Sequence, residues 1–297
     1  MAPTKYRPLR RPGRLLPVGI QTSGVRTIYF RASVAGPLTT GARPDVLAVE
    51  EALDIRTGNQ SFTVTMRTPG HDIDLALGLL VAEGVVRTPH DVVRVRELRL
   101  ERSGPFDVTA VVADLLPDSL ARATERARSS LTTSACGACG TAARNLLPAS
   151  CSPADDNFRV DPHLLASLPN RLRDGQRVFA RTGGLHAAGL FRSDGTPLVV
   201  REDVGRHNAV DKVVGWAYRA EQLPLIGSVL VVSGRASFEL VSKSITAGIP
   251  VLVAVSAPSS MAVALAREAG LTLLGFARDG GANVYAGAHR LGLDDQG

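Results

Sequence analysis

The sequence predicts an α/β protein whose main sheet is largely parallel, preceded by a smaller α+β unit. From about Asp161 onward, short continuous apolar runs alternate with segments of helical length, a pattern typical of parallel strands covered by helices. The first half instead mixes strand-like segments with one helical pattern. We therefore divide the 297-residue chain into a basic, poorly ordered arm at 1–44, an α+β unit at 45–128, a flexible loop at 129–160 and an α/β domain at 161–297.

The α+β unit is expected to contain four strands and one helix. Apolar residues recur every three or four positions over Asp72–Glu83, which predicts a helix that ends at Gly84. The turn sequence at Thr57–Gln60 separates the first two strands. The strands are expected, in order, at Val46–Leu53, Phe62–Arg67, Val92–Leu100 and Phe106–Val112.

The α/β domain begins with a helix start, because Asp161 is a good N-cap and Pro162 suits the first helical position. Strands are expected at Arg177–Arg181, Leu198–Val200, Val229–Ser233, Val251–Val255, Leu271–Phe276 and Asn283–Ala286. Helices are expected at Gly205–Ala220, Ser237–Ala247 and Ser259–Ala269. Functional residues of such a sheet gather at the carboxyl ends of its strands.

Composition excludes several classes of protein. The chain is 44% hydrophobic and 21% charged, as in ordinary globular proteins. Its longest apolar runs, such as Ile249–Val255, are far shorter than the ~20 residues that a membrane helix needs. Three cysteines are too few for a disulfide framework. We therefore expect a soluble, cytoplasmic protein without a membrane partner.

The positive charge is concentrated at the start of the chain. The net charge is +6, but eight of the 34 basic residues precede the first acid, Asp45, and leave 26 bases against 28 acids in the remainder. A proline-rich basic arm is typical of a solvated, poorly ordered tail. The nearly neutral body argues against a nucleic-acid partner.

The sharpest local motif is Cys136-Gly-Ala-Cys139, within a glycine-rich segment. A structural zinc site needs about four ligands, and only Cys151 and His163 lie within reach at irregular spacing. A thioredoxin-like redox pair would follow a strand, which is absent before Ala135. A sulfur carrier needs an accessible thiolate on a flexible arm. From spacing alone, the sulfur-carrier and redox interpretations are equally favoured, and both are favoured over a zinc site. Cys151 is assigned no role.

Three arginine-bearing turns follow successive strands. The segment Arg201–Lys212 is dense in polar groups at a strand-to-helix junction. Arg201, Arg206 and His207 are candidates to bind an anion beside the helix N-terminus. Asp203 or Asn208 is a candidate to cap the helix. Similar junctions recur around Arg235 and Arg278. Together they favour a shared anionic ligand such as a nucleotide, whereas His186 alone is typical of a core or turn histidine.

Several motifs together resemble the FdhD family of formate dehydrogenase accessory sulfurtransferases. The resemblance spans roughly residues 45–290, and the 201–212 segment is its most specific part. It is carried by Cys-Gly-Ala-Cys-Gly at 136–140, Thr-Gly-Gly-Leu-His-Ala-Ala at 182–188, Arg-Glu-Asp-Val-Gly-Arg-His-Asn-Ala-Val-Asp-Lys at 201–212, Gly-Phe-Ala-Arg at 275–278 and Asn-Val-Tyr at 283–285.

The resemblance implies a homodimeric sulfur carrier with a cytidine-deaminase-like core. Such a protein takes persulfide sulfur from a cysteine desulfurase. It passes the sulfur to the molybdenum cofactor in its bis(molybdopterin guanine dinucleotide) form, which formate dehydrogenase requires. By motif, Cys136 would carry the persulfide with Cys139 as its partner, and no structural metal is expected. The cofactor-binding residues would be Phe276, Ala277, Arg278, Asp279, Gly280 and Gly281.

Two alternatives follow from the same residues. One is a redox or zinc-binding Cys-x-x-Cys protein with a nucleotide-binding α/β domain. The other, a zinc deaminase, requires His-x-Glu followed by Pro-Cys-x-x-Cys, with the glutamate as proton shuttle. Here His186 is followed by Ala187-Ala188 and the cysteine pair lies upstream. The sequence therefore excludes the zinc deaminase and leaves the first alternative open.

Overall fold

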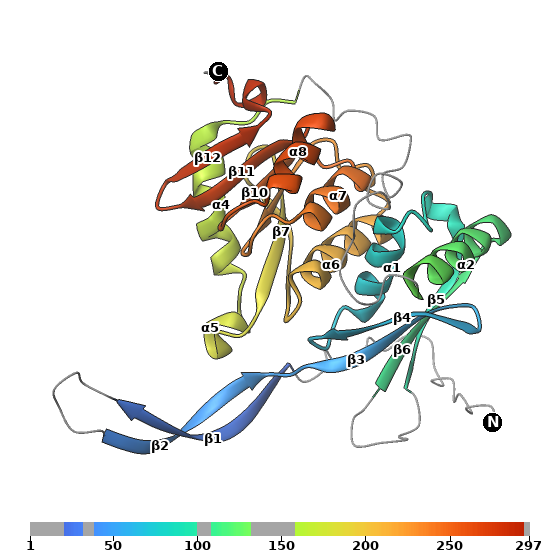
Figure 1. Cartoon of the computed structure of the whole chain (residues 1–297), viewed down its shortest axis with the longest axis horizontal. Helices are drawn as coiled ribbons and strands as arrows, with labels where there is room; N and C mark the ends of the chain where they lie inside the picture. Colours follow the sequence, from blue (N-terminus) through green and yellow to red (C-terminus); the bar gives the residue numbers. More distant parts are fainter. Residues whose placement is uncertain (1–20, 32–38, 100–107, 132–157, 294–297) are drawn as a thin grey trace.

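A computed structural model describes residues 21–31, 39–99, 108–131 and 158–293. Figure 1 shows a mixed α/β fold with three sheets: six strands in the main sheet, four in a smaller sheet and two in a hairpin. None of the helices within these ranges has the length and apolar character to cross a membrane.

The main sheet has the strand order β12-β11-β10-β9-β7-β8. Only β9, β10 and β11 are parallel, whereas β7 pairs antiparallel with both β8 and β9, and β12 pairs antiparallel with β11. The prediction of a largely parallel sheet is therefore wrong for the flanking strands. The connections β7–β8 and β11–β12 are far too short for a parallel crossover. The strands are β7 His186–Arg192, β8 Pro197–Asp203, β9 Ser228–Val232, β10 Val251–Ala254, β11 Thr272–Arg278 and β12 Gly281–Ala286.

Helices cover both faces of the main sheet (Figure 1). On one face lies α4 (Pro162–Asp174), which buries Leu165, Leu168 and Leu172. This helix begins as predicted, because the Asp161 carboxylate accepts a hydrogen bond from the His163 amide at 2.8 Å. The other face carries the three helices that follow β8, β9 and β10, together with most of the core. They are α6 Arg206–Arg219, α7 Phe238–Thr246 and α8 Ser260–Glu268, close to their predicted bounds.

The units β9–α7 and β10–α8 are successive copies of one pattern, offset by 22 residues. Val229 pairs with Val251 in the sheet, and the helix N-caps are Ser237 and Ser259. An isolated parallel bridge between Ala236 and Pro258 continues the pairing beyond the strands. The first turns of the two helices therefore lie next to each other at the carboxyl edge of the sheet.

The smaller sheet has the order β4-β3-β6-β5, with β3 and β6 parallel. Its helix α1 (Asp72–Ala82) and the following Gly84 turn, at φ 68°, match the prediction. A second helix, α2 (Pro117–Leu131), was not predicted, because alanine and charged residues occupy most of it, and it includes the first residues of the predicted 129–160 loop. The strands are β3 Glu51–Thr57, β4 Gln60–Arg67, β5 Val92–Arg99 and β6 Val108–Leu115. Short 3₁₀ turns occur at Pro89–Asp91 and Ala288–Leu291.

Several local expectations fail. The predicted strand Val46–Leu53 is interrupted at residues 49–50, and β7 was not predicted. The predicted strand at Arg177–Arg181 is instead the short helix α5 (Phe179–Thr182). The Glu202 carboxylate, from distant β8, accepts from the amides of Val178 at 2.9 Å and Phe179 at 2.7 Å. These bonds satisfy amides at the start of α5, so a tertiary contact overrides the local β preference.

The predicted disordered arm also contains a hairpin. Its strands β1 (Thr22–Arg31) and β2 (Thr39–Ala48) pair antiparallel along their whole length. The run of β-branched and aromatic residues from Val25 to Phe30 favours this strand despite the basic composition. In Figure 1 the hairpin projects away from both larger sheets, while residues 1–20 lie outside the described ranges.

The smaller unit packs against the main one through α1 and α6. A Cβ atom added at Gly78 would lie 1.8 Å from the Asp211 carbonyl oxygen, and one at Gly215 would lie 1.8 Å from that of Asp74. The two glycines therefore allow the helix backbones to touch. Leu77 and Leu80 of α1 join the same apolar cluster as Val210 of α6.

Candidate functional site

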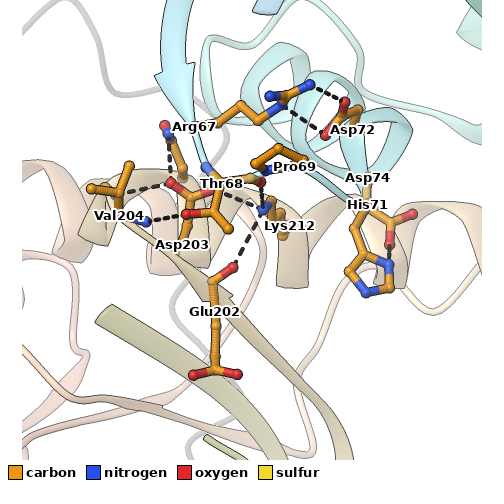
Figure 2. Close-up of polar contacts among 12 residues, drawn as sticks. Arg67, Thr68, Pro69, His71, Asp72, Asp74, Glu202, Asp203, Val204 and Lys212 are labelled. Atoms are coloured by element: carbon orange, nitrogen blue, oxygen red, sulfur yellow. Dashed lines mark hydrogen bonds and ion pairs between the residues drawn. The ribbon is translucent and has the colours of Figure 1, made fainter. Parts of the chain in front are cut away.

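A buried clamp forms where the Arg201–Lys212 segment meets the smaller unit (Figure 2). Asp203 and Lys212 are both 0% exposed and their Oδ2 and Nζ atoms lie 2.7 Å apart. Asp203 also accepts from the amides of Thr68 at 3.2 Å and Gly205 at 2.8 Å, and from Asn208 Nδ2 at 3.0 Å. Burial lowers the pKa of Lys212, against the opposing effect of the Asp203 carboxylate. Four residues of the segment, Asp203, Gly205, Asn208 and Lys212, are thus part of a structural clamp.

The clamp continues into a network around Asp74. Arg201 Nη2 lies 3.1 Å from Asp74 Oδ2, and Arg219 Nη1 lies 2.7 Å from Oδ1. Arg201 is therefore paired with a buried carboxylate, and its role in binding an anionic ligand stays a prediction. His71, in Figure 2 beside Asp74, has its Nδ1 at 3.8 Å from that carboxylate. Burial, followed by the charge of Arg201, lowers the pKa of His71 to about 4.

A second pair of side chains holds the start of α1. The guanidinium of Arg67, at the end of β4, contacts both carboxylate oxygens of Asp72, with Nε at 3.1 Å and Nη2 at 2.8 Å. Arg67 is only 2% exposed. This bidentate pair and the clamp together fix the strand-to-helix turn of the smaller unit against the main sheet.

A cavity of about 440 Å³ opens at the carboxyl edge of the main sheet, where the first turns of α6, α7 and α8 meet. Two of the predicted anion-binding residues lie here. Arg206 lines the cavity, and His207 contacts its wall with Nε2 at 2.7 Å from Glu239 Oε2 and 3.3 Å from Ser237 Oγ. The lining residues are Arg206, Ser237, Phe238, Glu239, Ser259, Ser260 and Met261.

Arg206 and His186 both lie beside Gly234. A Cβ atom at Gly234 would lie 3.4 Å from His186 Nδ1 and 3.7 Å from Arg206 Cδ. Burial, and then the charges of Arg206 and His207, lower the pKa of His186, which favours its neutral form. His186 thus lies close to Arg206 and His207, whereas its sequence context alone is typical of a core or turn histidine.

The segment Phe276–Gly281 forms the tip of the β11–β12 hairpin. Phe276 has a φ of 53° and is 39% exposed, while its amide donates to the Ser256 oxygen at 3.2 Å. Asp279 and Gly280 also have positive φ values, and a bulge interrupts the pairing between Gly275 and Arg278. A left-handed, exposed phenylalanine costs roughly 1–3 kcal/mol, and such strain clusters at functional sites.

The hairpin tip and the cavity are neighbours without being one pocket. The tip residues are absent from the cavity lining, yet the Ser256 oxygen that holds Phe276 begins the loop leading to Ser259. Ala277 is buried, whereas Arg278, Asp279, Gly280 and Gly281 are exposed.

Sequence reasoning missed Glu239 and the Ser259–Met261 wall, although the repeat noted above aligns them with the predicted Ser237 junction. Cys136, Cys139 and Cys151 lie outside the described residues. Across the part of the chain that the structure covers, His, Cys, Asp and Glu side chains form no group of three or more suited to a metal ion.

The chain matches the model of the FdhD/NarQ family over residues 48–292. It is 55% identical over 257 residues to the sulfur carrier protein FdhD of Nocardia farcinica, a match covering 84% of this chain and 89% of that protein. It is 51% identical over 265 residues to the protein of the same name from Mycolicibacterium paratuberculosis, covering 86% and 96%.

The fold resembles a crystal structure from Desulfotalea psychrophila, described as that of a candidate formate dehydrogenase accessory protein. The TM-score is 0.66 at 20% sequence identity, and the match covers 90% of this chain and 99% of that one. Family model, sequence relatives and fold thus agree, and the chain belongs to the FdhD/NarQ family.

Proposed function

We propose that this protein is a sulfur carrier that serves formate dehydrogenase. It accepts persulfide sulfur from a cysteine desulfurase and passes it to the molybdenum cofactor in its bis(molybdopterin guanine dinucleotide) form. Relatives at about half identity over most of the chain are named sulfur carriers, and this chain has the Cys136-Gly-Ala-Cys139 pair. The loading step, the homodimer and the cytoplasmic location belong to the same proposal.

The first step is a thiol exchange that needs no added oxidant. The Cys136 thiolate attacks the terminal sulfur of the desulfurase persulfide, forming a new S–S bond, and the desulfurase cysteine leaves as its thiolate. Cys139 is the neighbouring thiol for the later release of that sulfur. A glycine directly follows each of the two cysteines, and such small neighbours leave room for the exchange.

One structural observation supports the cofactor part of the proposal: a strained, exposed hairpin tip lies near the cavity that Arg206 lines at the carboxyl edge of the sheet. Arg278 and the exposed turn of Asp279 to Gly281 can contact phosphates and carbonyl oxygens. The Phe276 ring offers a face on which a guanine base can stack. These groups fit a guanine nucleotide end of the cofactor, which is the cargo of the carrier.

The carrier step is tested by loading the protein with sulfur. The full chain is incubated with a cysteine desulfurase and cysteine, and the digested protein is examined by mass spectrometry. A gain of about 32 Da, one sulfur atom, is expected on the peptide containing residues 136–139 and is lost in Cys136→Ser. Cys151→Ser is the matched control and keeps the adduct. A wild-type peptide that carries neither the added sulfur nor a 136–139 disulfide contradicts the carrier proposal. A 136–139 disulfide that forms equally without the desulfurase supports the redox alternative.

The cofactor site is tested with GDP as a fragment of the cofactor. Calorimetric titration of the wild type and Arg278→Ala is expected to show weaker binding in the variant, because a charge-assisted contact to phosphate is lost. Arg192→Ala, at the opposite end of the sheet, is the control and leaves binding unchanged. Equal affinity of Arg278→Ala and wild type would place the nucleotide elsewhere.

A further inference from the structure

We propose that the outer edge of β1 pairs with the same edge of a second copy of this chain and joins the two hairpins into one four-stranded sheet. The hairpin projects from both larger sheets, and within the described residues its own sheet has only two strands (Figure 1). An isolated two-stranded hairpin is at best marginally stable in water, whereas three or more strands can be stable. The inference assigns the contact of the proposed homodimer, and it rests on the proposed function only for the expectation that two copies associate.

The register of the hairpin shows which backbone groups face away from the partner strand. The Val49 amide donates to the Gln21 carbonyl oxygen at 2.9 Å, so these two residues form a hydrogen-bonded pair at the base of the hairpin. Such pairs alternate with pairs that do not exchange hydrogen bonds, and the register runs without a shift from Thr22 to Arg31. Every second residue therefore turns its N–H and C=O groups outward. On β1 these residues are Thr22, Gly24, Arg26, Ile28 and Phe30.

The outer edge of β2 is blocked near its centre. Pro44, which pairs with Arg26, is one of its outward-facing residues and has no N–H to donate. The next outward amide, that of Val46, donates to the Asp45 carboxylate at 2.9 Å. Proline and charged side chains are among the devices by which edge strands avoid pairing with other chains. The β2 edge is therefore a protected edge.

The outer edge of β1 lacks this protection. None of its outward-facing residues is a proline, so each has both a donor and an acceptor. Gly24, Val25 and Arg26 are exposed. Val25 is 39% exposed, and Leu47, on the same face of the hairpin, is 49% exposed. A long exposed strand of this kind is a template for another strand.

The chain's own first residues are a poor fit to this edge. Residues 1–20 contain four prolines, at positions 3, 8, 12 and 17, and proline cannot donate to a ladder. The strand β1 contains none. In a two-fold dimer one patch meets its own copy, so a strand that can pair antiparallel with itself supplies both halves of the interface.

Two registers fit such a dimer. The two copies of β1 pair about an axis through one residue of the strand. An axis at Arg26 would place two arginines directly opposite each other, which is destabilising. An axis at Val25 or Thr27 avoids this, and either one leaves four pairs of outward-facing residues that exchange two hydrogen bonds each. The resulting total of about eight hydrogen bonds lies within the roughly 5–15 of a typical interface.

The size of the contact determines how tightly the copies associate. A ten-residue strand is about 34 Å long, so a strip about 10 Å deep along its edge covers roughly 300 Å² on each copy. Interfaces that bury less than about 1,200 Å² in total belong to weak complexes. We therefore expect a reversible dimer that dissociates on dilution.

The test is analytical ultracentrifugation of the full chain from about 1 µM to about 100 µM, a range suited to weak association. Arg26→Pro removes an outward donor of β1 and keeps the hydrogen bonds to β2, because Arg26 and Pro44 do not exchange any. We expect it to raise the Kd of the dimer tenfold or more. Ala42→Pro makes the same change on the outer edge of β2 and is the matched control, which dimerises like the wild type.

A second variant separates the backbone donor from the side-chain charge. Arg26→Thr keeps the N–H and removes the charge, so it is expected to dimerise at least as tightly as the wild type, a result that a misfolded hairpin cannot produce. The inference is overturned if Arg26→Pro dimerises like the wild type, or if Ala42→Pro weakens the dimer equally. A wild type that is monomeric at every concentration also overturns it and leaves another occupant, such as residues 1–20, for the edge.

Sulfur loading of the same samples keeps this inference distinct from the carrier proposal. A loaded 136–139 peptide, with an Arg26→Pro dimer as tight as that of the wild type, overturns the β1 contact alone. A dimer that Arg26→Pro dissociates, with a peptide that gains no sulfur, supports the contact and contradicts the carrier proposal.

Discussion

Replacing Lys212 by methionine tests the buried clamp most directly. The variant keeps the aliphatic stem and deletes an ammonium group that is 0% exposed and 2.7 Å from Asp203 Oδ2. It also removes the donor to the carbonyl oxygens of Thr68 at 2.9 Å and Glu202 at 3.3 Å. Losing one partner of a buried ion pair costs about 3–5 kcal/mol.

The contacts that Asp203 keeps in the variant narrow the expected loss of stability. Asp203 keeps three donors in the variant, from Thr68, Gly205 and Asn208, and these continue to stabilise its carboxylate. The carbonyl oxygens of Thr68 and Glu202 lose their donor, which adds to the loss of stability. We therefore expect a loss of about 4 kcal/mol, a large part of the roughly 5–15 kcal/mol that stabilises a folded domain.

The assay is urea unfolding followed by far-ultraviolet circular dichroism. Arg96→Met is the matched control, because Arg96 and Asp114 form a pair whose side chains are 33% and 36% exposed. Surface pairs are worth at most about 1 kcal/mol, so this control unfolds near the wild-type midpoint. Adding Asp203→Asn to Lys212→Met should restore part of the loss, because the unpaired charge disappears. A loss below about 1 kcal/mol in Lys212→Met would refute the clamp.

Three further outcomes are expected. The His71→Asn variant fits the backbone, because asparagine tolerates the φ of 59°. In the wild type the free energy of unfolding should fall as the pH drops from 6.5 to about 4, because the unfolded histidine binds a proton there and the folded one does not. The variant should lack this fall, and the measurement is the difference between the pH–stability curves of the two proteins. Gly78→Ala should destabilise the protein by more than the ~1–3 kcal/mol of ordinary overpacking, because the new Cβ would overlap the backbone of α6. The control Gly227→Ala has open space around its Cβ and should unfold in urea like the wild type. Phe276→Gly should fold at least as stably as the wild type yet bind GDP more weakly in calorimetry; equal GDP affinity would show that the ring has no binding role.

Much of the local structure could be predicted because its signals are local. The α1 helix has regular apolar spacing and a terminal glycine, and α4 has its Asp161 cap and Pro162. The same holds for the three helices after β8, β9 and β10. By contrast, α5 depends on Glu202, a residue more than twenty positions away, and α2 has too few large apolar residues to be visible as a pattern.

The candidate site, too, could be predicted from the sequence only in part. Arginines at strand ends could be recognised as a group, but a sequence does not say which of them already has a partner. Arg201 is paired with Asp74, which lies 127 positions earlier, whereas Arg206 faces the cavity. Glu239 has no local motif, and it becomes part of the site only because α7 and α8 start side by side.

By itself the sequence determined the family, the Cys136–Cys139 motif on which the carrier proposal rests and the order of most helices and strands, because short-range spacing and motif residues specify these. The tertiary structure decided the mixed direction of the sheet, the buried Asp203–Lys212 clamp and the cavity at Arg206. The physical reason is that burial, charge pairing and strand direction depend on which distant segments meet. Those contacts pair Arg201 with Asp74 and place Arg206 at the cavity.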